Sequence, residues 1–145
     1  MYQLPPWVWP TALGIVCVLA LWRGRFDERS AAFCYLVDWL LTRLAYIVSG
    51  QAEVVVLGID TALLGALLWI ALRTRRFWPL FSAAFQLLAI LTHLARLADT
   101  NVSLWAYLTA ELVWSYLVIG AIGYGAWTAP RYANADAVAP ADTRR

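Results

Sequence analysis

Three side chains that can exchange protons or bind cations lie within strongly apolar stretches of this sequence. Asp60 follows "EVVVLGI", His93 follows "LLAILT" and Glu111 follows "LWAYLTA"; His93 is the only histidine in the chain. An ionisable residue near the centre of a bilayer costs about 2.5 to 3.5 kcal/mol on insertion scales, so each of these residues needs a partner or a function. Two carboxylates and one imidazole in a medium of low dielectric constant could hold a cation or relay a proton.

The depth of these residues in alternating helices predicts that they share one layer. If the apolar segments cross a membrane in turn, each residue lies within roughly 6 to 11 Å of the same face, at a rise of 1.5 Å per residue. Arg43, in the segment before Asp60, falls in the same layer. Ionisable side chains at one depth favour contacts between neighbouring helices.

Helical spacing predicts that the polar side chains of one segment share a face. Gln86 and His93 are two helical turns apart, and Arg96 lies one turn beyond His93 on nearly the same stripe. We therefore predict an outward-facing ligand or ion site formed by Asp60, His93 and Glu111, with Gln86 beside it and Arg96 at its mouth.

Two further ionisable residues, in the segment before Asp60, point in different directions. Asp38 shares a helical face with Tyr35 and Thr42, whereas Arg43 lies about 140° away at 100° per residue. One helix cannot easily direct both side chains into one site, so we assign Asp38 and Arg43 to polar pairing between helices. A structural alternative applies to the whole layer, because interior polar groups also hold neighbouring helices together.

Five apolar segments are each close to the ~20 residues that a helix needs to cross about 30 Å of hydrocarbon. They run from Trp7 to Trp22, Ala31 to Val48, Val54 to Leu72, Trp78 to Leu97, and Leu104 to Trp127. These segments predict an all-α, polytopic transmembrane bundle, with one domain over residues 1–129 and a disordered cytoplasmic tail over residues 130–145. A bundle of four spans, with the first segment peripheral or cleaved, is the alternative.

The arginine residues between the apolar segments predict the orientation of the bundle. They lie in the first and third connections and after the last segment, at Arg23, Arg25, Arg29, Arg73, Arg75, Arg76, Arg131, Arg144 and Arg145. The second connection contains no basic residue. Because cytoplasmic loops carry an excess of basic residues, we expect the N-terminus outside and the C-terminus inside.

The composition argues against several classes of function. Of the 145 residues, 63% are hydrophobic and 14% are charged, whereas a soluble domain has about 25% charged residues. The net charge of +2 is too small for a nucleic-acid surface. Cys17 and Cys34 lack CxxC spacing, and a lone histidine without CxxCH is weak evidence for haem or pigment. No GxSxG or HExxH occurs, so we expect no enzyme, no metal and no cofactor.

Small residues at intervals of four mark helix faces that allow close approach to another helix. Gly58, Ala62 and Ala66 form one such face, and Ala121 and Gly125 form another. We therefore expect the lipid bilayer as one partner and a second copy of the chain, or a larger membrane complex, as another.

Two hypotheses for the function follow. The first is a non-enzymatic accessory or self-associating protein of the cell inner membrane, whose polar layer holds its helices together. The second is a small transporter, or a proton or cation channel subunit, that uses Asp60, His93 and Glu111. The first needs only helices in contact, whereas the second needs a polar site between them.

Overall fold

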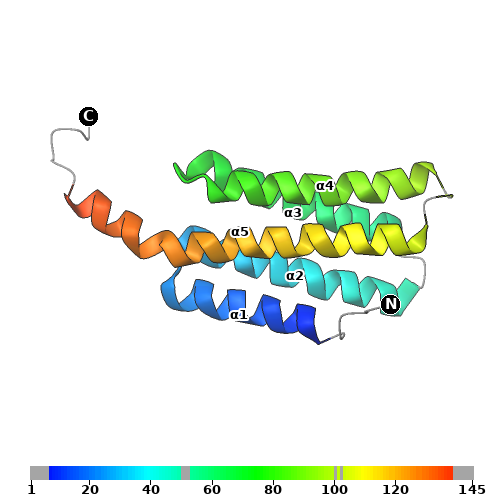
Figure 1. Ribbon diagram of the computed structural model, residues 1–145, viewed down its shortest axis with the longest axis horizontal. Helices are drawn as coiled ribbons and strands as arrows, with labels where there is room; N and C mark the ends of the chain where they lie inside the picture. Colours follow the sequence, from blue (N-terminus) through cyan, green and yellow to red (C-terminus); the bar gives the residue numbers. More distant parts are fainter. Residues whose placement is uncertain (1–6, 50–52, 100, 102, 139–145) are drawn as a thin grey trace.

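The five apolar segments form five α-helices that run alternately up and down (Figure 1). The computed structural model describes residues 7–49, 53–99, 101 and 103–138. The helices are α1 (Val8–Arg23), α2 (Phe26–Ser49), α3 (Glu53–Arg73), α4 (Trp78–Ala98) and α5 (Leu104–Val138). The predicted all-α bundle is therefore confirmed.

The short connections between antiparallel helices place the basic residues of the first and third connections at the same end of the bundle. The helices pack side by side in chain order, and α1 closes the bundle by packing against both α2 and α5, with Leu13 and Ala20 in the buried core. We call the end that carries residues 23–25 and 73–76 the arginine end. The opposite end, where α2 and α4 finish and α3 and α5 begin, is called the histidine end.

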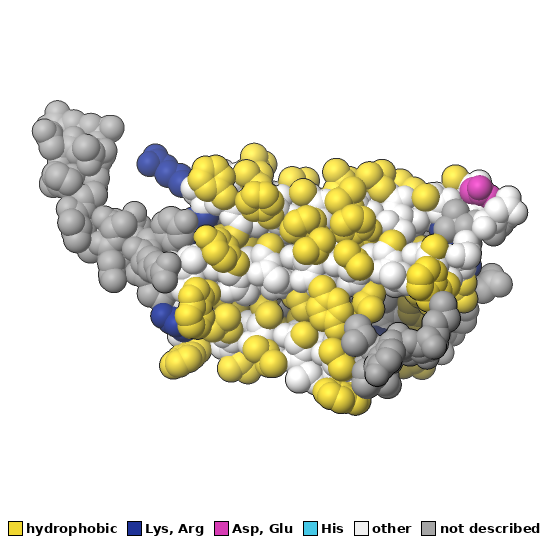
Figure 2. Space-filling model, in the orientation of Figure 1, with side chains coloured by type: hydrophobic (Ala, Val, Ile, Leu, Met, Phe, Trp, Pro, Cys, Tyr) yellow, Lys and Arg dark blue, Asp and Glu magenta, His cyan; other side chains and the backbone are white. Residues whose placement is uncertain are grey.

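Within the described part of the chain, four helices, α2 to α5, are long and apolar enough to cross a membrane, whereas α1 is a shorter apolar helix of 16 residues. Large apolar side chains cover the outside of the bundle, including Ile47 and Leu72, which are 80% and 84% exposed. Figure 2 shows this apolar surface across one face of the helices, with arginine side chains at one end. An exposed apolar surface of this extent needs lipid around it. The chain is a multi-pass membrane protein.

The centre of the bundle is packed with small and aliphatic side chains. Leu67, Val118, Ile122 and others are fully buried. Near the arginine end, α5 passes directly over the indole ring of Trp78, where a Cβ atom on Gly125 would lie 2.6 Å from the Trp78 Cδ2 atom. Of the face of small residues predicted at Ala121 and Gly125, Gly125 therefore packs against another helix of the same chain.

Two helix boundaries differ from the sequence prediction by more than one residue. Helix α2 begins at Phe26 rather than Ala31, because acidic Asp27 and Glu28 occupy its first turn, where the helix dipole favours negative charge. Helix α5 continues to Val138, so residues 130–138 of the predicted tail are helical. This stretch is rich in alanine, the strongest helix former. Residues 139–145 of the predicted tail lie outside the described residues.

Candidate functional site

The structure brings the three predicted side chains together from three different helices. The His93 Nε2 atom on α4 lies 2.9 Å from Asp60 Oδ2 on α3 and 3.5 Å from Glu111 Oε2 on α5. The Asp60 and His93 residues are buried, and Glu111 is partly buried. One imidazole nitrogen therefore faces two carboxylates inside the bundle.

The second imidazole nitrogen is also engaged. His93 Nδ1 lies 2.8 Å from the Tyr107 hydroxyl, and the two rings meet edge to face. When the Tyr107 hydroxyl donates to Nδ1, the proton of the neutral imidazole is on Nε2 and points toward the carboxylates. The Gln86 amide nitrogen lies 3.3 Å from Asp60 Oδ1, so its N–H group donates to the same carboxylate. This network fixes the positions of the ring and of Asp60.

A cavity of about 200 Å³ adjoins this network. All five helices contribute to its walls: Trp9 from α1, Tyr35, Asp38 and Thr42 from α2, Asp60 from α3, His93 from α4, and Glu111 and Ser115 from α5 are among its lining residues. A water molecule needs about 10 to 15 Å³ of such space, so the cavity has room for several.

Acidic groups outnumber basic ones around the cavity. Among the described residues, three carboxylates, from Asp38, Asp60 and Glu111, line it, and the His93 imidazole is the one basic group. Two of these carboxylates have a buried oxygen, Asp38 Oδ1 and Glu111 Oε1, without a hydrogen-bond partner among the described residues. Buried polar atoms are normally paired, so these two oxygens have acceptor capacity for a proton, a cation or a water molecule.

The remaining predicted site residues occupy other positions. Arg96 Nε lies 3.6 Å from Glu53 Oε1, and its guanidinium group is 5.1 Å from the centre of the Tyr107 ring, at the edge of the network. Arg43 is exposed on α2. Asp38 lines the cavity instead, and within the described part of the chain no ion pair joins Asp38 or Arg43 to another helix.

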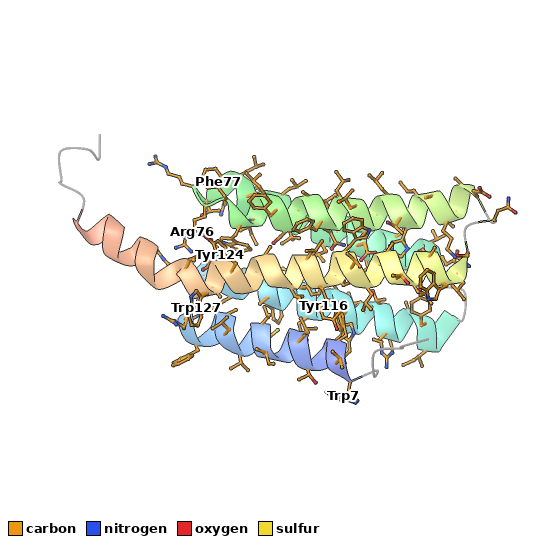
Figure 3. The ribbon with its side chains drawn as sticks, in the orientation of Figure 1. Trp7, Arg76, Phe77, Tyr116, Tyr124 and Trp127 are labelled. Atoms are coloured by element: carbon orange, nitrogen blue, oxygen red, sulfur yellow. The ribbon has the colours of Figure 1, made fainter. Side chains whose placement is uncertain are left out.

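A second buried polar cluster, at the arginine end, was not predicted from the sequence. The side chain of Glu28 is fully buried and accepts hydrogen bonds from the Arg76 guanidinium group, from Trp78 Nε1 at 3.1 Å and from the Arg25 backbone N–H at 2.8 Å. Figure 3 labels Arg76 at this end of the bundle. The acidic pair at residues 27–28 is a local signal for the start of a helix, but it does not indicate that Glu28 is buried against Arg76 and Trp78.

A metal ion needs histidine, cysteine or carboxylate side chains in a specific arrangement. No group of three or more His, Cys, Asp or Glu side chains among the described residues is arranged to hold a metal ion. Cys17 and Cys34 are both free and half-buried.

Comparisons with protein-family models, with curated proteins and with solved structures found no match for this chain.

Proposed function

We propose that the chain is a non-enzymatic protein of the cell inner membrane that carries protons, as a small transporter or channel subunit. The observation that supports this proposal is the acidic cavity, in which His93 lies between Asp60 and Glu111. In the proposed orientation, the histidine end faces outside and the arginine end faces the cytoplasm.

The balance of charge in the cavity favours an exchangeable cation. Three ionised carboxylates in a medium of low dielectric constant repel one another, and one imidazolium can neutralise only one of them. The other two need bound protons or small cations. A proton fits this network better than a metal ion, because both His93 nitrogens already have hydrogen-bond partners.

The packing toward the arginine end supports the role of a subunit. Beyond the cavity, the interior is filled by aliphatic side chains, including Leu67, Val118 and Ile122, which are 0% exposed. Tightly packed aliphatic side chains offer few partners to a water molecule between the cavity and the arginine end. Passage across the whole membrane therefore requires a change in helix packing or a polar surface supplied by a second chain.

Proton flux in liposomes tests the proposed function. The purified protein is reconstituted with a pH-sensitive dye inside, and a potassium diffusion potential drives cation entry. We expect acidification faster than in vesicles without protein. The proposal is wrong if the two rates are equal. Sodium uptake down a sodium gradient, without acidification, would identify a metal cation as the substrate instead.

Association with another helix is a second candidate function, favoured by an apolar groove on the outside of the bundle. Gly58, Ala62 and Ala66 lie along this groove of about 460 Å³ between α2 and α3. A Cβ atom on Gly58 would meet nothing within 4 Å, so its surface is open. Small residues on an open helix face allow a second transmembrane helix to approach closely.

A leucine at the groove should weaken this association. We expect Gly58→Leu to reduce the apparent mass of the protein in detergent, measured by light scattering, because the added side chain fills the groove. Gly65→Leu is the matched control, because Gly65 is also open but does not line the groove. A monomeric wild-type protein, or equal masses for all three proteins, would contradict self-association.

A further inference from the structure

We propose that the arginine end binds the phosphate headgroup of an anionic membrane lipid. This inference is independent of the proposed proton transport. A pocket of about 360 Å³ lies between the two connections at this end. Its lining consists of Arg25, Phe26 and Asp27, where the first connection leads into α2, and of Arg73, Thr74, Arg75 and Arg76, where α3 leads into the next connection.

The charge of the pocket suits a phosphate diester. Four guanidinium groups line it, together with one carboxylate, that of Asp27. The Arg76 charge is compensated by buried Glu28. The remaining groups carry an excess of positive charge, with Arg73 and Arg75 exposed at the surface. A guanidinium group binds two phosphate oxygens through parallel hydrogen bonds, which fixes the orientation of the phosphate better than the ammonium group of lysine does.

The pocket is held in shape before any ligand binds. Glu28 joins its two sides, because its carboxylate accepts hydrogen bonds from the Arg25 backbone and from the Arg76 side chain. The Arg73 guanidinium group lies 4.2 Å from the centre of the Trp69 ring. A cation over an aromatic face keeps the N–H groups at its edge available for an anion. Preorganisation of this kind lowers the entropic cost of binding.

The surroundings of the pocket favour a lipid over free phosphate. Phe26 lines the pocket and is 83% exposed, and Phe77, which follows Arg76, is 73% exposed. Figure 3 labels Arg76 and Phe77 at the same end of the bundle. Phenylalanine next to basic side chains is typical of segments at the membrane interface, where the ring reaches the acyl chains and the charge meets the headgroups. A lipid can use both features, whereas inorganic phosphate can use only the arginines.

Binding of a short-chain lipid to the purified full-length protein tests the site. Diheptanoyl phosphatidylglycerol is titrated in detergent, with tryptophan fluorescence as the readout, because Trp69 lies beside the pocket. We expect saturable binding that is about 30-fold weaker in the double variant Arg73→Gln/Arg75→Gln. Each arginine near an anionic headgroup increases the affinity about fivefold, and the variant removes two of them. Phosphatidylcholine of the same chain length should bind at least about tenfold more weakly than phosphatidylglycerol.

The matched control is Arg29→Gln, which removes an exposed arginine near the same end that does not line the pocket. It should bind phosphatidylglycerol as the wild type does, and thermal melting should show that all variants remain folded. Equal binding by the double variant and the control would overturn the proposal. So would equal binding of phosphatidylcholine, or binding of inorganic phosphate as tight as that of the lipid.

Discussion

Replacing His93 with alanine is expected to reduce proton flux through reconstituted protein by on the order of 100-fold, the lower end of the range for a positioned acid–base group. The imidazole is the only group whose two nitrogens connect the Tyr107 hydroxyl with the Asp60 and Glu111 carboxylates. It can accept a proton at one nitrogen and release one from the other. Alanine removes both positions. Dye acidification in liposomes is the measurement.

The neighbouring residue provides a control for His93→Ala. Thr92 lies on the same helix, where its hydroxyl donates to the Leu88 carbonyl and accepts from Trp114 Nε1 on α5, so Thr92→Val removes a contact between the two helices without touching the lining of the cavity. Thr92→Val should therefore keep its flux within about twofold of the wild type. A second variant, His93→Gln, keeps side-chain volume and hydrogen bonding, so loss of flux in a well-folded His93→Gln protein separates transport from packing. Normal flux in that variant would show that His93 only holds helices together.

Replacing Glu28 with alanine is expected to lower the free energy of unfolding by about 3 to 5 kcal/mol, the range for breaking a buried ion pair at one partner. The side chain is completely buried and has three hydrogen-bond donors around it. Without the Glu28 carboxylate, the Arg76 side chain, which is 9% exposed, loses this counter-charge, and the Trp78 N–H loses this acceptor. Unfolding in detergent with increasing denaturant measures the difference.

Asp27 is the matched control for Glu28, because it is acidic, lies in the same first turn and is only partly buried. Asp27→Ala removes one favourable interaction with the helix dipole and should cost no more than about 1 kcal/mol. Glu28→Gln should fall between the two alanine variants, since the amide keeps one acceptor but not the charge. If Glu28→Ala and Asp27→Ala have the same stability, the buried cluster does not hold the arginine end together.

The polar layer near the histidine end could be predicted because its signals are local. Asp60, His93 and Glu111 interrupt long apolar runs, and alternating helices of known rise place them at one depth. Helical spacing also assigned Asp38 to the same face as Tyr35 and Thr42, and all three line the cavity. That α2 completes the cavity could not be predicted, because it depends on which helices are neighbours.

Glu28 could not be predicted for a related reason. The stretch "RGRFDERS" is hydrophilic and resembles an exposed connection, yet Glu28 in it is fully buried. Its burial depends on Arg76 and Trp78, which lie 48 and 50 residues further along the chain. No local pattern encodes that contact. Similarly, spacing identified both faces of small residues, but only the structure shows that Gly125 packs inside the chain whereas Gly58 remains open.

Whether the cavity carboxylates carry protons is tested most directly by changing all three without changing their shape. The variant Asp38→Asn/Asp60→Asn/Glu111→Gln keeps the side-chain volumes around the cavity and removes every carboxylate that lines it. In liposomes driven by the same potential, its dye acidification should fall to the rate of vesicles without protein, while its circular dichroism remains helical. Proton flux equal to that of the wild type, from a folded triple variant, would contradict a proton path through this cavity.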